Sequence, residues 1–147
     1  MKCYFLPEDI VALRTQIDAL HRKLTELGRE QGEAAAQSSE NMGHDDACQE
    51  SIYYARGIVV QRLNDLERAI GKAEVVHPRG PFQRVQIGAT VTLSDGRSFK
   101  IGSFMIFANH PTPTISYASP LAQAMMSRVV GEEFEFRNNL FNIVALE

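Results

Sequence analysis

Two stretches of the chain carry apolar residues at the spacing of a coiled-coil helix. In the first, the intervals alternate between three and four residues for nearly three heptads, at Ile10, Leu13, Ile17, Leu20, Leu24 and Leu27. The second stripe consists of Ile52, Val59, Leu63, Leu66 and Ile70, with Ala55 or Arg56 at the missing step. So narrow an apolar face is buried by another helix rather than by a globular core. The pattern predicts an antiparallel coiled-coil hairpin over residues 1–76.

Local signals set the expected bounds of the two helices. Pro7 suits the first turn of a helix, so the first helix is expected to run from Pro7 to about Gln37, about 45 Å at 1.5 Å per residue. Polar turn formers over residues 37–44 then interrupt the apolar pattern. Asp46 and, three residues later, Gln49 resemble a capping box that opens the second helix.

The pattern changes after about Val76, where we expect the second helix to end. Residues 77–82 begin with His-Pro-Arg-Gly-Pro and are typical of a linker. Beyond them, alternating and β-branched runs predict short strands at residues 84–87, 89–93, 98–101, 114–117, 133–136 and 141–146. We expect Asp95-Gly96 and Asn138-Asn139 to supply hairpin turns.

One short helix is expected inside this β-rich region. Ser119 suits the N-cap position and Pro120 the first helical position, with the helix ending at about Met126. The whole pattern predicts an α+β protein, in which the hairpin precedes a small antiparallel β domain over residues 83–147.

Composition restricts the class of protein. Hydrophobic residues make up 44% and charged residues 22% of the chain, as in folded soluble proteins. No apolar run approaches the roughly 20 residues that span a bilayer, and the opening residues lack the apolar core of a signal peptide. Cys3 and Cys48 form neither a metal pair nor a disulfide framework. A cytoplasmic location without a membrane partner is expected.

Acidic residues gather around the expected turn of the hairpin. The net charge is only −3, but the segment 30–55 has no Lys or Arg and contains Glu30, Glu33, Glu40, Asp45, Asp46 and Glu50. A block of this kind is commonly a solvated surface, and its charge repels nucleic-acid phosphates. Asp45 and Asp46 also suit the positive end of the second helix, so capping explains them without a partner.

Several motifs resemble the Gre family of bacterial transcription elongation factors. In the second half of the chain they are the Gly-Ala-Thr-Val strand entry at 88–91, the Ser-Pro-Leu-Ala helix start at 119–122 and the Gly-Glu-Glu turn at 131–133. In the first half, residues 13–20 and 62–67 resemble the two hairpin helices of the family. The motifs occur in the family's order, so the resemblance covers nearly the whole chain.

The resemblance implies a fold and a mechanism. In the Gre family a C-terminal domain of FKBP-like fold binds the rim of the secondary channel of RNA polymerase, and the hairpin enters the channel. Carboxylates at its tip help to hold a second Mg²⁺, so that the polymerase cleaves the 3′ end of backtracked nascent RNA. Carboxylate oxygens suit Mg²⁺, and two metal ions stabilise both the attacking and the leaving oxygen. The resemblance therefore implies a monomeric accessory factor without a cofactor or an enzymatic activity of its own.

The resemblance assigns the tip carboxylates to Glu40, Asp45 and Asp46. The family carries two acids three residues apart, in an Asp-Leu-x-Glu-Asn-Ala pattern. Alignment of the first helix matches Glu40 to the first acid, and alignment of the second helix matches Asp45 to the second. The turn is therefore two residues longer here, and the acids are retained without their spacing.

Four further residues are candidates for contacts with the polymerase. Arg56 and Arg62 correspond to a basic patch that in the family faces RNA or the channel wall, although salt bridges on the helix surface also explain them. Ser119 and Pro120 are candidates for the polymerase-facing surface, although their place at a helix start explains them without a partner.

The leading hypothesis is a polymerase-binding factor that stimulates RNA cleavage. The altered tip keeps open a paralogue that occupies the channel without stimulating cleavage, as an inhibitor or regulator. A prolyl isomerase is disfavoured because its pocket is commonly floored by Trp and this chain has none. A short-hairpin polymerase binder similar to the nucleoside diphosphate kinase regulator Rnk is disfavoured by the expected length of the hairpin.

Overall fold

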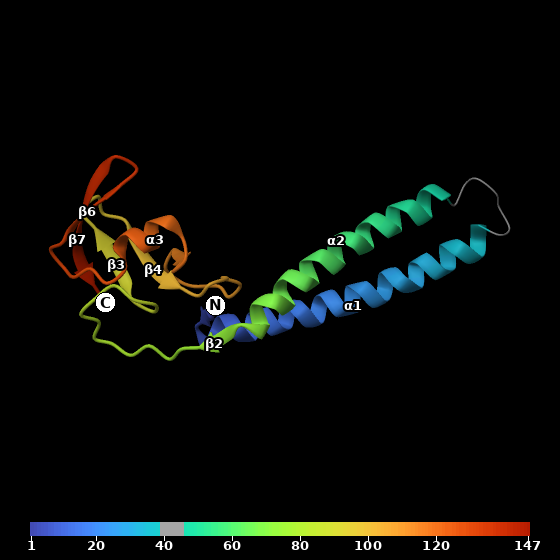
Figure 1. The fold of residues 1–147 in the computed structure, drawn as a ribbon, viewed down its shortest axis with the longest axis horizontal. Helices are drawn as coiled ribbons and strands as arrows, with labels where there is room; N and C mark the ends of the chain where they lie inside the picture. Colours follow the sequence, from blue (N-terminus) through green and yellow to red (C-terminus); the bar gives the residue numbers. More distant parts are fainter. Residues whose placement is uncertain (39–45) are drawn as a thin grey trace. The chain divides into compact units, whose positions relative to one another are not determined.

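The computed structural model describes the backbone of residues 1–38 and 46–147, and side chains over 1–30 and 50–147 (Figure 1). The described chain forms two compact units. Leu13–Gly71 is one unit, and Met1–Ala12 joins Lys72–Glu147 in the other. The N-terminal residues therefore fold with the β-rich part of the chain.

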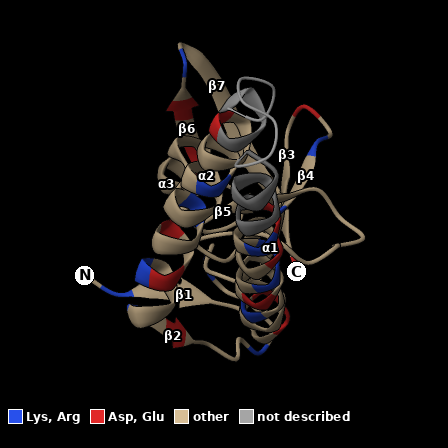
Figure 2. Cartoon of the chain, turned by 90° about the vertical axis from the view of Figure 1, so that its right-hand side faces the viewer, with Lys and Arg blue, Asp and Glu red and all other residues tan. Residues whose placement is uncertain are grey.

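The predicted hairpin is present as two long helices that run side by side in opposite directions (Figures 1 and 2). Helix α1 spans Pro7–Ser38 and helix α2 spans Asp46–Gly71. The predicted stripes are buried at Leu13, Ile17, Leu27, Leu63 and Leu66. They are half-buried at Leu20, Leu24, Ile52, Ala55, Val59 and Ile70. Ala55 fills the missing step of the second stripe, since Arg56 is exposed.

Charged residues of both signs are distributed along the described parts of both helices (Figure 2). His21 Nε2 on α1 lies 3.1 Å from Glu67 Oε1 on α2. Within α2, Arg68 lies 3.7 Å from Asp65. These side chains are about half exposed to water, and exposed pairs of this kind contribute at most about 1 kcal/mol. The contact between the two apolar stripes, which we call the seam, is therefore the main interaction that holds the two helices together.

The second helix ends earlier than the sequence predicts. Residues Ala73–Val75 form strand β2, which pairs in parallel with strand β1, Cys3–Phe5. The Cys3 N–H donates to the Lys72 carbonyl at 2.8 Å, and the Val76 N–H donates to the Phe5 carbonyl at 2.9 Å. The expectation of a helix to about Val76 was wrong because β1 supplies hydrogen-bond partners that the sequence pattern did not reveal.

The C-terminal part of the chain forms a five-stranded sheet with the order β5-β4-β3-β7-β6. The strands are β3 (Thr90–Leu93), β4 (Ser98–Gly102), β5 (Thr114–Ser116), β6 (Glu133–Phe136) and β7 (Asn139–Leu146). Three pairs are antiparallel as predicted, whereas β4 and β5 run parallel. The loop between β4 and β5 carries the chain back to the starting end of β4, which an antiparallel hairpin would not require. The α+β class is confirmed.

The predicted strand at residues 84–87 is absent. Val85 is buried, but its N–H donates to the Arg128 carbonyl and its carbonyl accepts from the Ser127 N–H, both at 2.9 Å. The residue thus pairs with the segment after helix α3, Pro120–Met125, rather than with a strand of the sheet. Alternation along the sequence identified the buried side chain correctly but not the partner of its backbone.

The core of this unit lies between the sheet and α3. Its buried members are Val85, Val91, Leu93, Ile101, Ala122, Met125, Phe134 and Ile143. Alternate residues of β3 point into it, with Val91 and Leu93 buried and the two threonines only half-buried. At about 1.5–3 kcal/mol for each large apolar side chain, this burial is the main stabilising contribution to the unit.

Two tight turns shape the edges of the sheet. In the β3–β4 turn, Gly96 adopts a φ of 89°, which glycine accommodates without strain. The Arg97 N–H and the Arg97 guanidinium both donate hydrogen bonds to the Asp95 carboxylate. These bonds, the one from the backbone N–H above all, hold the pKa of the Asp95 carboxyl below its ordinary value, although desolvation acts in the opposite direction. The β6–β7 turn consists of Arg137 and Asn138, both with positive φ. The predicted β-hairpin of β6 and β7 is confirmed, with its turn one residue earlier than predicted.

A buried carboxylate anchors the first turn of α1 within its unit. Asp9 is fully buried. Its Oδ2 accepts a 2.6 Å hydrogen bond from Ser103 Oγ. Its Oδ1 accepts from the N–H groups of Phe107 at 3.3 Å and Ala108 at 3.2 Å, and lies 3.3 Å from His110 Nε2. The carboxylate therefore joins α1 to the loop between β4 and β5.

Removal of this carboxylate is expected to destabilise the protein strongly. Asp9→Ala leaves Ser103, His110 and two N–H groups without an acceptor in a buried site, so the free energy of unfolding should fall by about 3–5 kcal/mol. The change is measured by urea denaturation.

Glu8→Ala is the matched control from the same helical turn. Glu8 Oε1 lies 3.5 Å from Lys100 Nζ in a partly exposed pair. Its loss should cost no more than about 1 kcal/mol. Equal and small effects of the two substitutions would show that the Asp9 cluster does not anchor the helix.

Candidate functional site

Three acidic residues, Glu40, Asp45 and Asp46, were predicted as the carboxylates of the hairpin turn. Glu40 and Asp45 fall outside the described residues. Asp46 is the first residue of α2, and its side chain is also outside them. The separation of these carboxylates stays a prediction from the sequence.

The two predicted arginines lie on α2. Arg56 and Arg62 are both exposed. Six residues on an α-helix separate their directions by about 120° around the helix axis. They therefore point to different sides of α2, and any joint contact would need a partner that wraps around the helix.

Ser119 and Pro120 open α3 as the sequence predicts. Ser119 has extended backbone angles, and its Oγ accepts a 3.3 Å hydrogen bond from the Ala122 N–H. Its carbonyl accepts from the Gln123 N–H at 2.9 Å. Pro120 stands exposed at the first helical position. The cap at the start of α3 therefore explains Ser119 without a partner.

Aromatic residues precede α3 and connect it to the start of the chain. The Tyr117 hydroxyl accepts a 3.1 Å hydrogen bond from the Tyr4 N–H, and the two rings lie 5.9 Å apart. The Phe104 ring lies 6.4 Å from Tyr117 and 6.4 Å from Phe5. Tyr117, three residues before Pro120, is thereby joined to strand β1.

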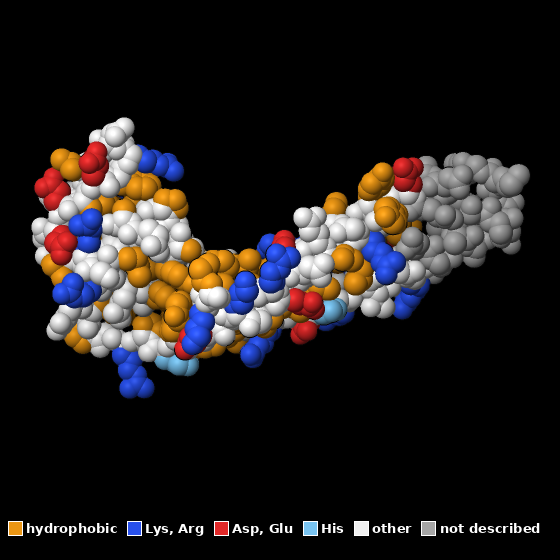
Figure 3. Space-filling view, viewed as in Figure 1, with side chains coloured by type: hydrophobic (Ala, Val, Ile, Leu, Met, Phe, Trp, Pro, Cys, Tyr) orange, Lys and Arg blue, Asp and Glu red, His pale blue; other side chains and the backbone are white. Residues whose placement is uncertain are grey.

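The structure adds a surface that the sequence analysis missed, on the side of α2 that is not in the seam. A shallow depression of about 530 Å³ is lined there by Tyr53, Tyr54, Arg56, Gly57, Ile58, Val60 and Gln61, which we call the Gly57 face. The exposed fractions of Tyr53, Tyr54 and Ile58 are 65%, 62% and 70%. Figure 3 shows apolar side chains among charged ones along this part of the hairpin.

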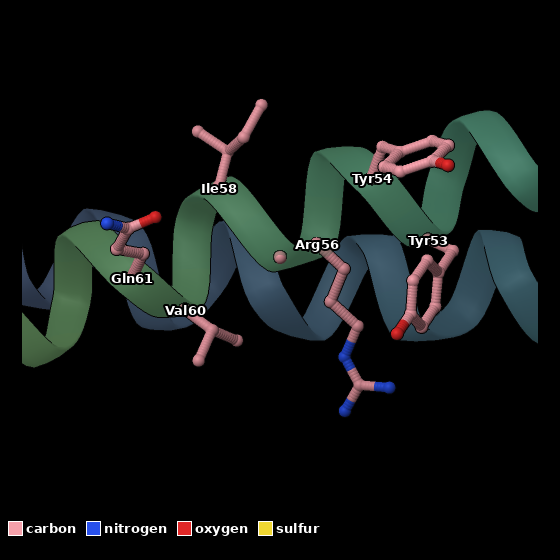
Figure 4. A pocket seen from close by; sticks show the side chains of 7 residues that line it. Tyr53, Tyr54, Arg56, Ile58, Val60 and Gln61 are labelled. Carbon is pink, nitrogen blue, oxygen red and sulfur yellow. The ribbon is translucent and has the colours of Figure 1, made fainter.

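Side chains of the Gly57 face spread to both sides of the helix (Figure 4). Tyr54 and Ile58 point to one side, and Tyr53, Arg56 and Val60 point to the other. The Tyr53 and Tyr54 rings meet edge to face with centroids 6.0 Å apart. The sequence did contain a signal for this face. Tyr53, Tyr54 and Ile58 are apolar residues of the second helix outside its predicted stripe, so contact with the first helix does not explain them.

Two classes of site are absent from the described part of the chain. No three His, Cys, Asp or Glu side chains among the residues described are grouped as they would be around a metal ion. No described helix combines the length and the apolar composition that crossing a membrane requires.

Comparison with known proteins finds relatives that share one name. "Transcription elongation factor GreA" of Paracoccus denitrificans is 29% identical over 137 residues, covering 87% of this chain and 88% of the relative. The GreA of Mesomycoplasma hyopneumoniae is 32% identical over 114 residues, covering 74% of this chain and 68% of the relative. The solved structure of GreA factor homolog 1 (Gfh1) of Thermus thermophilus is 22% identical with a TM-score of 0.49, covering 100% and 99%. No protein-family model matches the chain.

The cap at Ser119 generates a stability prediction. Ser119→Ala removes the acceptor for the Ala122 N–H and should lower the free energy of unfolding by about 1 kcal/mol. Ser119→Asp should restore stability to within about 0.5 kcal/mol, because Asp is an equally good N-cap. Thermal denaturation followed by circular dichroism measures both. A Ser119→Ala protein as stable as the parent would contradict the capping role.

Proposed function

Because the chain belongs to the GreA family of transcription elongation factors, we propose that it binds RNA polymerase and inserts its helical hairpin into the secondary channel. The hairpin carries this proposal: α1 has 32 residues and α2 has 26, and the segment between them contains Glu40 and Asp45. A helix of that length extends about 48 Å at 1.5 Å per residue. A two-helix element is slender enough for a channel that a globular unit cannot enter.

The acidic segment supplies the chemistry of the proposed function. Glu40 and Asp45, with Asp46 beside them, would donate carboxylate oxygens to a Mg²⁺ ion in the polymerase active site, and hard Mg²⁺ prefers such oxygens. Two or three carboxylates are too few ligands for a closed site, so the polymerase's own carboxylates must complete it. The chemistry supplied there would be hydrolysis of the phosphodiester of backtracked RNA, which would leave a 3′ hydroxyl on the upstream RNA and a 5′ phosphate on the released fragment.

The C-terminal unit supplies the anchor in this proposal. Pro120 is exposed on a helix start held by the Ser119 cap, and we assign both residues to the polymerase-facing surface. Arg56 and Arg62 would lie inside the channel, facing RNA or its wall. The protein acts as a monomer in the cytoplasm, through the active site of the polymerase rather than one of its own.

A second candidate function is channel occupancy without cleavage. The observation that favours it is the acidic spacing, since Glu40 and Asp45 stand five apart instead of the three of the family pattern. If both carboxylates cannot reach one ion, the inserted hairpin would block the channel instead of assisting hydrolysis. Such a protein would inhibit or regulate the polymerase.

The test uses purified polymerase in stalled, backtracked elongation complexes. Added factor is expected to shorten the RNA faster than polymerase alone. The double variant Glu40→Ala/Asp45→Ala should lose at least about tenfold of this stimulation, as expected for loss of ligands to a catalytic metal, while binding polymerase with unchanged affinity. Gel analysis of end-labelled RNA and fluorescence anisotropy give the two readouts.

Glu30→Ala is the control, because Glu30 is an exposed acid on α1 outside the inter-helix segment. This variant should stimulate RNA cleavage by the polymerase as much as the parent does. Binding without any acceleration of RNA shortening would reject cleavage stimulation and leave channel occupancy. Absence of polymerase binding would reject both functions.

A further inference from the structure

The Gly57 face has the arrangement of a surface that receives another helix. Tyr54, Gly57, Ile58 and Gln61 occupy positions i, i+3, i+4 and i+7 of α2. Four residues with that spacing form the hole into which one side chain of a neighbouring helix inserts in a coiled coil.

A second hole of the same kind lies beside the first. Tyr53, Arg56, Gly57 and Val60 repeat the spacing and share Gly57 with it. The two adjoining holes together comprise all the residues that line the depression of about 530 Å³. The seam with α1 uses other positions of α2, such as Leu63 and Leu66. One side of α2 is thus packed against α1, and the Gly57 face on its other side has no helix packed on it within the described residues.

Gly57 gives the Gly57 face its depth, because glycine has no side chain. A Cβ atom placed on Gly57 would have nothing within 4 Å, so no packing inside the described protein requires glycine there. Glycine also destabilises a helix interior relative to alanine. A glycine that weakens its own helix and serves no internal contact is explained if a partner's side chain needs the space above it.

We propose that the Gly57 face docks an α-helix of RNA polymerase, with an apolar side chain of that helix inserted over Gly57. The inference rests on the function proposed above, in which the hairpin lies inside the polymerase. Tyr53, Tyr54 and Ile58 form an exposed apolar border that such a side chain would bury.

The size of the surface favours a partner that is already held nearby. A stable independent interface buries about 1,200–2,000 Å² in total, and a few exposed side chains on one helix face fall short of that. A contact of this size becomes effective when a second contact raises the local concentration of the partner. An anchored C-terminal unit would provide that second contact only for the polymerase.

Two other occupants fit less well. Aromatic rings also stack on nucleic-acid bases, and Arg56 attracts phosphates. Glu50, one turn before Tyr53 and Tyr54, offsets this one positive charge among the lining residues. A second copy of this chain would meet the same limit of area without an anchor. Both are distinguished from the polymerase helix by the experiment.

The test fills the hole without harming the fold. Gly57→Gln places a side chain into open space. Gly28→Gln is the matched control, since Gly28 lies on α1 and a Cβ there also meets nothing within 4 Å. Both variants should melt at a higher temperature than the parent, because glutamine favours the helix over glycine.

Binding to nucleic-acid-free core polymerase is the readout. Gly57→Gln should bind at least about fivefold more weakly than the parent, the effect of losing one well-buried contact. Gly28→Gln should bind with unchanged affinity. A variant that gains stability and loses affinity separates docking from folding.

Each contrary result overturns the inference in a different way. If Gly57→Gln binds like the parent, the docking site is wrong and polymerase binding still stands. If the parent itself does not bind, the proposed function falls as well. If the loss of affinity appears only with backtracked RNA present, RNA occupies the face. If the parent sediments as a dimer and Gly57→Gln as a monomer, the occupant is a second copy.

Discussion

The narrow apolar seam between α1 and α2 constrains everything else that the hairpin does. Its buried members, such as Leu13, Ile17, Leu63 and Leu66, line only the facing sides of the two helices. Two helices packed in this way bury far less surface per residue than a globular core does. The remaining sides of α2 are therefore left in water, and the Gly57 face is one of them. The hairpin is long and leaves much of its surface in water, and for the same reason it buries little apolar surface that would stabilise it.

The start of α1 is stabilised by a different interaction. The carboxylate of Asp9 is buried, and a buried charge is tolerated only when donors surround it. Ser103, His110 and two backbone N–H groups meet this requirement. The loop between β4 and β5 is thereby folded around a residue more than ninety positions earlier in the chain. One carboxylate organises both the helix start and the loop.

The sequence predicted those features that depend on local periodicity and failed where distant partners decide. The seam, the Ser119 cap and most strands followed from spacing and turn chemistry. Strand β2 and the pairing of Val85 with Ser127 depend on segments far away in sequence, and the Asp9 cluster has no periodic signature. For the candidate site, the sequence placed Arg56 and Arg62 on the second helix and Ser119 at a helix start, and the structure has them there, while their roles stay predictions. The Gly57 face was missed because apolar residues were assigned to one stripe only.

The pairing of β1 with β2 makes the hairpin an insertion between two adjacent strands. Cys3 and Ala73 are direct neighbours in this pairing, although seventy positions separate them in the chain. Equal whole heptads added to or removed from both helices would leave these two ends in place and keep the seam in register. Evolution can therefore lengthen or shorten the hairpin in steps of seven residues per helix without a change in the pairing of β1 with β2. The length of the hairpin and the surface of the β-rich unit are therefore properties that insertions and substitutions can change separately.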